Sequence, residues 1–266
     1  MATSAVEDGS IRTPMLKRLL PAIFSLLLAA PLFAQSPLRL AAAADLEPVL
    51  PPILAQFQKQ TGIQVETTYK ASAVLTTQIL NGAPFDLFLS ADRNFPTRLI
   101  DAGLADTTAP VTYAKGTLVL WERKDSPLPP PSLELLRNPA LKRLAIANPE
   151  RAPYGRAAVA VLKSLHLYQA LQPRLATAEN IAQAAQFADS ANADAGLISL
   201  TSALTPQLTA SGRYFVIPRD LYPPIEQAAV VVKASSQRAA AHRLLDFLLS
   251  APVQAEMARG GLAPVK

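Results

Sequence analysis

The chain has 266 residues, half of them hydrophobic, and this length and composition exclude an intrinsically disordered protein. Its 25 basic and 20 acidic side chains give a net charge of +5, and they are scattered singly, which argues against a nucleic-acid-binding protein. The absence of cysteine excludes disulfide bonds and thiolate metal sites.

The N-terminal segment has the pattern of a secretory signal. Two basic residues, Lys17 and Arg18, precede an apolar stretch that ends in the small residue Ala34. The stretch is shorter than the ~20 residues that span a bilayer and contains prolines, which disfavours the alternative of a membrane anchor. We expect residues 1–34 to be a signal segment cleaved near Ala34, with Met15 as an alternative start. The protein is therefore expected to be exported.

Strands and helices alternate in the first part of the exported chain. The apolar run 38–44 precedes a helical pattern that continues to Gly62, with prolines in its first turns. Next are expected, in order, a strand at 63–69, a helix at 72–81, a continuous apolar strand at 85–91 and a helix at 93–101. Successive strand–helix units with apolar strands indicate a parallel sheet covered on both faces.

A second set of elements follows and indicates a second lobe. Strands are expected at 116–122, 143–150, 194–200, 214–218 and 225–233. Helices are expected at 154–167 and 178–193, and 236–261 is expected to form two helices broken at Pro252. The pattern predicts two α/β lobes, one formed by 37–115 plus 226–266 and the other by 116–225.

The residues needed for enzymatic chemistry are few. The chain has no G-x-S-x-G turn, no phosphate-binding loop and no G-x-G-x-x-G motif. The sequence around His166 and His242 indicates ordinary helix residues and not catalytic bases. Asp86 and Asp92 flank a strand end, where Asp86 ends a turn and Asp92 caps the next helix. A secreted hydrolase that uses Ser72 as its nucleophile stays open as an alternative, although no base is expected beside it.

One type of junction recurs along the chain, in which a strand ends, small or polar residues follow and a helix begins. Helix N-termini offer free N–H donors and a partial positive charge, so several of them together could hold an anion. In open α/β sheets, ligands bind outside the carboxyl ends of the strands. The alternative is that each junction is only a helix cap, with Ser72 capping its own helix. The junctions are Ala44–Asp45, Ala71–Ser72, Tyr154–Gly155, Glu179–Ile181 and Ser199.

Four segments resemble the periplasmic molybdate-binding proteins of ABC importers, the ModA family. They are "LRLAAAADLEPVLPPILAQFQKQTG", "APFDLFLSAD", "IANPERAPYGRAA" and "PPIEQAAVVV", and the resemblance extends from about residue 38 to 266. It implies an α/β solute-binding protein of two lobes (type II), each a mixed sheet flanked by helices, joined by crossover strands.

The resemblance also implies a set of ligand-binding residues. In the family, hydroxyls and backbone N–H groups from both lobes hold the oxyanion, and the matching positions here are Ala44, Ser72, Tyr154, Ile181 and Ser199. Ala44 replaces the usual serine and keeps only its N–H, and Ser199 replaces a frequent tyrosine. Asp45 is expected to donate its N–H while its carboxylate turns away as a cap. Molybdenum would be held as its oxyanion by these same residues, without a cofactor or a separate metal site.

The resemblance implies that the protein binds an oxyanion and does not catalyse a reaction. A periplasmic monomer would bind molybdate or tungstate between its lobes, close, and deliver the ion to an ABC transporter permease. The changes at Ala44 and Ser199 leave open a different tetrahedral oxyanion, such as sulfate or a phosphate-like ion.

Overall fold

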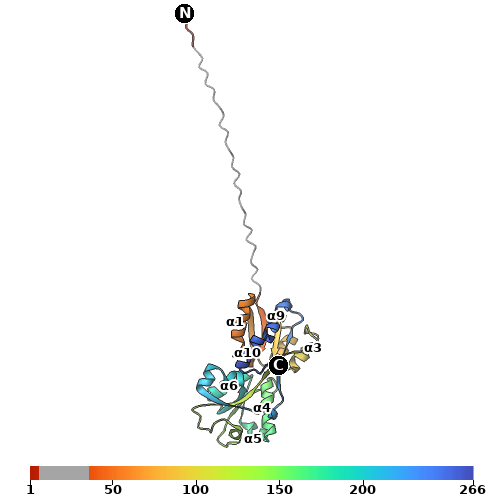
Figure 1. Cartoon of the computed structure of the whole chain (residues 1–266), viewed down its shortest axis with the longest axis vertical. Helices are drawn as coiled ribbons and strands as arrows, with labels where there is room; N and C mark the ends of the chain where they lie inside the picture. The colour runs from red at the N-terminus through yellow and green to blue at the C-terminus, as the bar shows by residue number, and fades with distance from the viewer. Residues whose placement is uncertain (6–35, 266) are drawn as a thin grey trace. The chain divides into compact units, whose positions relative to one another are not determined.

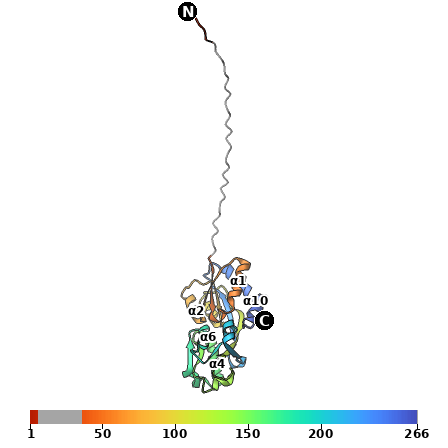
Figure 2. The same cartoon turned by 90° about the vertical axis from the view of Figure 1, so that its left-hand side faces the viewer.

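A computed structural model describes residues 1–5 and 36–265 of the chain. Met15, the expected cleavage position at Ala34, and most of the expected signal segment lie outside the described residues. From residue 36 onward the chain forms two five-stranded sheets, each flanked by helices (Figures 1 and 2). None of the helices in the described part combines the length and the apolar character needed to cross a membrane.

The first sheet is mixed, with the strand order β2-β1-β3-β10-β4. Its strands are β1 (Leu38–Ala43), β2 (Val65–Lys70), β3 (Leu87–Ser90), β4 (Val111–Gly116) and β10 (Ile225–Val231). The first three are parallel, whereas β10 runs antiparallel to both β3 and β4. The mixed sheet that the family resemblance implied is therefore confirmed: β1, β2 and β3 are parallel, as the strand–helix pattern indicated, and β10 enters from the second sheet in the opposite direction.

The helices of the first lobe agree closely with the sequence pattern. They are α1 (Leu50–Thr61), α2 (Ser72–Leu80), α3 (Asn94–Asp101), α9 (Arg238–Leu249) and α10 (Ala251–Arg259). The first helix ends at Gly62, whose φ of 74° is the left-handed conformation that glycine adopts readily. The break before α10 falls at Ser250, with Pro252 in the first turn, where a missing N–H has no consequence.

The second sheet is also mixed, with the order β7-β6-β8-β5-β9. Its strands are β5 (Leu118–Arg123), β6 (Leu144–Ala147), β7 (Leu175–Ala178), β8 (Ala195–Ser199) and β9 (Gly212–Val216). Its helices are α4 (Pro153–Ser164), α5 (Tyr168–Leu171), α6 (Ile181–Asp189), α7 (Leu200–Ala203) and α8 (Pro206–Ser211). In both views α4 and α6 lie beside this sheet, while α1 and α10 lie beside the first sheet.

The chain passes between the two sheets twice. Only Thr117 separates β4 of the first sheet from β5 of the second, and residues 217–224 connect β9 back to β10. The two crossing strands of the first sheet, β4 and β10, are neighbours. The exact bounds of the two lobes, 37–115 plus 226–266 and 116–225, stay a prediction.

Candidate functional site

Four of the predicted site positions line one small cavity where the lobes meet. Ala44 follows β1 and Ser72 follows β2 in the first lobe. Tyr154 and Ile181 lie in the first turns of α4 and α6 in the second lobe. Asp45 completes this group, and the cavity they line has a volume of about 10 Å³. That volume holds about one water molecule, so the walls are nearly in contact.

Three of these positions present backbone N–H groups at helix N-termini. Ser72 and Ile181 are the first residues of α2 and α6, and Tyr154 follows Pro153, which begins α4 and has no N–H. N–H groups of a first helical turn have no acceptor within their own helix and carry a partial positive charge. The cavity therefore collects backbone donors from three helix N-termini in two lobes.

The Ser72 side chain does not cap its helix, and this sequence-based alternative was wrong. The residue before α2 is Ala71, and no side chain forms a cap hydrogen bond there. Instead, the buried Ser72 Oγ accepts a hydrogen bond from the backbone N–H of Ala91 at 3.1 Å. Because this bond uses an oxygen lone pair, the hydroxyl proton remains available for donation in the cavity.

Asp45 also differs from its expected role, because its carboxylate does not turn away as a cap. The 3₁₀ turn Ala44–Leu46 has no side-chain cap, and the Asp45 side chain is fully buried in the cavity wall. Its Oδ2 accepts hydrogen bonds from the hydroxyl of Tyr154, at 3.1 Å, and from Nε2 of Gln227. Burial raises the pKa of Asp45 from 3.8 to about 6, and these hydrogen bonds lower it only in part.

Sequence reasoning missed two residues that support Asp45 from the crossing strands. Gln227 lies on β10 and Tyr113 on β4, and the Tyr113 hydroxyl donates to Gln227 Oε1 at 2.9 Å. Both side chains are fully buried. The available signal was Gln227 itself, a polar residue inside the apolar strand "IEQAAVV". Buried polar side chains need partners, so its position indicated a polar neighbour.

Ser199 is not among the residues that line the cavity. It precedes α7 as its N-cap, and its Oγ accepts from the Ser202 N–H at 3.2 Å. The same oxygen accepts from Thr201 Oγ1 at 2.9 Å. The structure therefore does not bring Ser199 together with the other four positions, because its hydroxyl is used in a local cap.

Gly155, next to Tyr154, allows α4 to begin close to β6. A Cβ at this position would lie 2.3 Å from the carbonyl oxygen of Ala147, a rigid backbone atom. We expect Gly155→Ala to lower the free energy of unfolding by about 1–3 kcal/mol, measured by urea denaturation. Gly260→Ala is a comparison variant with a smaller expected loss, because its Cβ would meet methyl groups of Val49 at 2.9 and 3.0 Å and no backbone atom closer than 3.4 Å. Equal losses in both variants would contradict this interpretation.

Among the described residues, neither histidine forms a hydrogen bond with Ser72, the nucleophile of the hydrolase alternative. His242 Nε2 pairs with Asp106 Oδ2 at 2.9 Å. His166 was expected within a helix, but it follows the end of α4 with a left-handed φ of 56°. Asp92 accepts from the Asn94 N–H at 2.6 Å, but it is not the cap that the sequence predicted, because the N-cap residue of α3 is Arg93. Within residues 1–5 and 36–265, no cluster of three acidic or histidine side chains could hold a metal ion.

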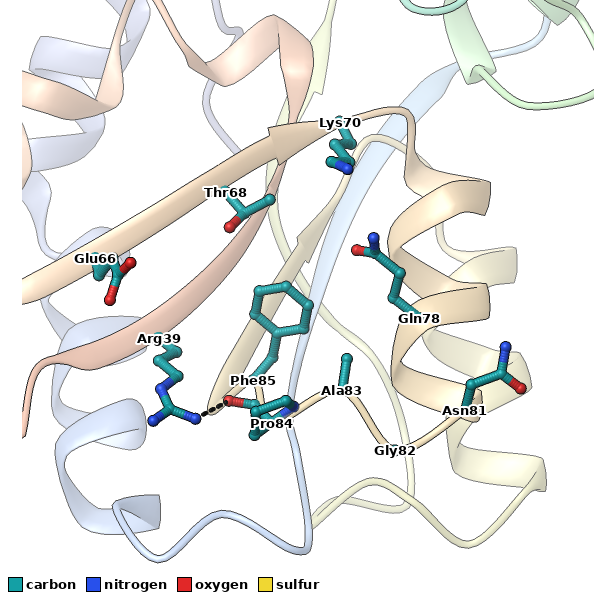
Figure 3. Close-up of a pocket in the computed structure, with 10 residues that line it drawn as sticks. All are labelled: Arg39, Glu66, Thr68, Lys70, Gln78, Asn81, Gly82, Ala83, Pro84 and Phe85. Carbon is teal, nitrogen blue, oxygen red and sulfur yellow. Dashed lines mark hydrogen bonds between the residues drawn. The ribbon is translucent and has the colours of Figure 1, made fainter.

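A much larger cavity lies on the first lobe alone and does not match the predicted site. It has a volume of about 760 Å³ and lies between β2 and α2 (Figure 3). Lys70 at the end of β2 and Gln78 on α2 line it, and Arg39 closes part of its rim through a 3.4 Å hydrogen bond to the Pro84 carbonyl. Apart from Lys70, it shares no residue with the small cavity between the lobes.

Comparisons with known proteins agree with this fold. Residues 38–263 match the family described as bacterial extracellular solute-binding protein. The molybdate-binding protein ModA of Azotobacter vinelandii is 39% identical over 210 residues, 79% of this chain and 83% of that protein. ModA of Rhodobacter capsulatus is 38% identical over 208 residues, 78% of this chain and 81% of that protein.

Solved structures show the same relationship. The periplasmic molybdate-binding protein of Azotobacter vinelandii superposes with a TM-score of 0.81 at 32% identity, over 86% of this chain and all of that chain. The sulfate-binding protein SubI of Mycobacterium tuberculosis shares the fold, with a TM-score of 0.71 at 20% identity over 86% of this chain and 87% of that chain. The chain therefore belongs to the bacterial extracellular solute-binding proteins, in the ModA family.

Proposed function

We propose that this protein captures molybdate or tungstate outside the cytoplasm and delivers it to the permease of an ABC importer. It acts as a periplasmic monomer, and the ligand is held in the small cavity between the lobes. The observation that carries the proposal is the convergence of Ser72, Tyr154 and Ile181, from three helix N-termini, on that cavity. Relatives at 39% and 38% identity that are named molybdate-binding support the choice of ligand.

The donor set suits a ligand that must be bound and released. Backbone N–H groups and the Ser72 hydroxyl are neutral, so they stabilise a bound anion through hydrogen bonds and do not form a fixed ion pair with it. Lys70 is the one cationic residue of the cavity wall. A cavity of about 10 Å³ is smaller than a tetrahedral oxyanion requires, so the walls must part to admit the ligand. Hinge motion between lobes provides that opening.

Besides the hydrogen bond from Tyr154 to Asp45, three contacts between the lobes favour the closed arrangement. The Ala73 N–H of α2 donates to the carbonyl of Arg151, before α4, at 3.2 Å. Asp92, after β3, forms an ion pair with Arg156 of α4. The Arg156 guanidinium also lies 5.4 Å from the ring centroid of Phe95 in the first lobe. These contacts are made only when the lobes approach each other.

We expect Arg156→Gln to weaken oxyanion binding about two- to fivefold, because a partly exposed ion pair contributes only about 0.5–1 kcal/mol to closure. The effect should appear as faster dissociation in stopped-flow measurements. Arg151→Gln is the matched control, because it removes an exposed positive charge nearby but keeps the backbone carbonyl that accepts from Ala73. A larger effect from the control would contradict the role of Arg156.

Calorimetric titration of the purified protein with molybdate, tungstate, sulfate and phosphate tests the proposed function. We expect binding heat with molybdate or tungstate and at least tenfold weaker binding of the other two ions, which corresponds to about 1.4 kcal/mol. No binding of molybdate or tungstate would refute the ligand assignment.

A different tetrahedral oxyanion is the second candidate, and one observation favours it. Ala44 supplies no hydroxyl to the cavity, and Asp45 places a carboxyl group in its wall. A deprotonated carboxylate accepts a hydrogen bond, so it would suit an oxyanion that still carries a proton, such as a phosphate-like ion. Tighter binding of phosphate than of molybdate in the same titration would establish this alternative.

A further inference from the structure

Asp45 is a buried carboxyl group in the wall of a cavity proposed to hold a dianion. Its side chain is fully buried, and among the described residues it belongs to no salt bridge. Lys70 lines the same cavity, but none of the salt bridges in the described part of the chain joins it to Asp45. A carboxylate and a dianion in one cavity of low dielectric constant repel each other strongly, so both cannot bind there fully charged.

The two oxygens of Asp45 have different surroundings. Oδ2 receives both protein donors, the Tyr154 hydroxyl and the Gln227 amide. Oδ1 is buried and has no hydrogen-bond partner among the described residues. A proton on the carboxyl group therefore belongs on Oδ1, because Oδ2 already accepts two hydrogen bonds. A protonated Oδ1 is a donor, and a buried donor requires an acceptor.

We propose that Asp45, protonated on Oδ1, donates a hydrogen bond to an oxygen of the captured oxyanion and so determines which charge state of the site binds it. The proposal rests on the proposed function. The carboxyl group then supplies the hydroxyl donor that its neighbour Ala44 lacks. Where the free protein carries Asp45 as a carboxylate, the Oδ1–H bond forms with a proton taken from solvent, and the site gains one proton for each anion bound.

None of the groups that hydrogen-bond Asp45 competes with it for the proton, so Asp45 is the residue that is protonated. Tyr154 and Tyr113 are neutral, because burial raises the pKa of both hydroxyls well above the usual value of 10.0. Gln227 does not titrate, and its neighbour Glu226 lies 3.9 Å from Arg93 in an ion pair. The elements packed against the Asp45 turn include β2, α6 and α7, and α4 and β10 contact its carboxyl group through Tyr154 and Gln227. Besides Tyr154, their ionisable residues are Glu66, Tyr69 and Lys70 on β2, Arg156 and Lys163 on α4, Glu226 on β10 and Asp189 at the far end of α6, with none on α7.

The Asp45 carboxyl group of the ligand-free protein changes its protonation state near neutral pH. Burial raises the pKa of Asp45 to about 6, so the group is largely ionised at pH 8 and largely protonated at pH 5. A bound dianion raises this pKa further. By linkage, the anion then binds the protonated form, and its apparent affinity falls as the pH rises above 6.

The test is the pH dependence of molybdate binding by the full chain and by Asp45→Asn. For the wild type, the dissociation constant is expected to rise about 50-fold from pH 6 to pH 8. In Asp45→Asn the amide oxygen still accepts from Tyr154 and Gln227, and the NH₂ group replaces the Oδ1–H donor without titrating. Its dissociation constant is therefore expected to change less than about threefold over the same range.

Calorimetry in buffers of different ionisation enthalpy counts the protons directly. At pH 8 we expect about one proton taken up for each molybdate bound by the wild type, and none by Asp45→Asn. Glu47→Gln is the matched control, because it removes the same charge two residues away from an exposed position, and it should retain the wild-type uptake.

The outcomes separate this inference from the proposed function. If wild type and Asp45→Asn both bind molybdate at pH 6 but the wild-type affinity does not change with pH, only the role of Asp45 is wrong. A pH dependence that persists in Asp45→Asn assigns the proton to the ligand or to another residue and also overturns it. If neither protein binds molybdate at pH 6, the proposed function itself fails.

Discussion

Replacing Ser72 with alanine is expected to weaken molybdate binding about 10- to 100-fold, because a hydrogen bond to a charged ligand contributes about 1.5–3 kcal/mol. Ser72 is the one predicted position whose side-chain hydroxyl lies in the cavity wall without donating to another protein group. Its proton is therefore the side-chain donor that the substitution removes. Calorimetric titration of both proteins with molybdate at pH 6 gives the ratio of dissociation constants.

The same substitution also affects stability, for a reason separate from helix capping. Without Ser72 Oγ, the buried N–H of Ala91 loses its acceptor, which costs about 1–3 kcal/mol in the free energy of unfolding. Binding must therefore be measured below the unfolding transition of the variant. Thr77→Ala on the same helix is a control, because its exposed hydroxyl donates only to the Ala73 carbonyl. If Ser72→Ala binds molybdate as tightly as the wild type does, the site is wrongly placed.

Replacing Asp45 with asparagine is expected to be more stabilising for the ligand-free protein at pH 8 than at pH 4, by about 2–3 kcal/mol in the free energy of unfolding. The pKa of Asp45 is raised from 3.8 to about 6 in the folded protein. Between these two values the folded state binds the proton more tightly than the unfolded state does. The free energy of unfolding of the wild type therefore falls as the pH rises from about 4 to about 6, and it changes no further above this range. Asparagine does not ionise, so the variant does not lose this stability as the pH rises.

Urea denaturation of wild type and Asp45→Asn without oxyanion, at pH 4 and at pH 8, measures this difference. The exposed Glu47→Gln variant controls for the loss of one negative charge and should show little change. A difference between wild type and Asp45→Asn that is the same at both pH values would show that burial does not perturb the Asp45 carboxyl group.

The sequence predicted the part of the site that depends on local signals. Ala44, Ser72, Tyr154 and Ile181 each follow a strand or begin a helix, and both features can be recognised from short patterns. The parallel order of β1, β2 and β3 then brings the carboxyl ends of the strands to one edge of the sheet, so the first two residues lie close together.

The rest of the site depends on contacts that local patterns do not encode. The bond from Gln227 to Asp45 joins residues 182 positions apart, and only the return of β10 into the first sheet creates it. For that reason the buried role of Asp45 was missed and a cap was expected. At Ser199 a local contact decided the outcome. The resemblance assigned the Ser199 hydroxyl to the ligand, but its oxygen accepts a hydrogen bond from the Ser202 N–H and caps α7.

The two connections between the sheets have very different lengths, and this difference limits how the lobes can separate. Thr117 alone joins β4 to β5, whereas eight residues, 217–224, join β9 to β10. A link of one residue cannot stretch, so the hinge motion proposed above would pivot at a point close to Thr117. The longer connection, with three prolines, must follow that rotation.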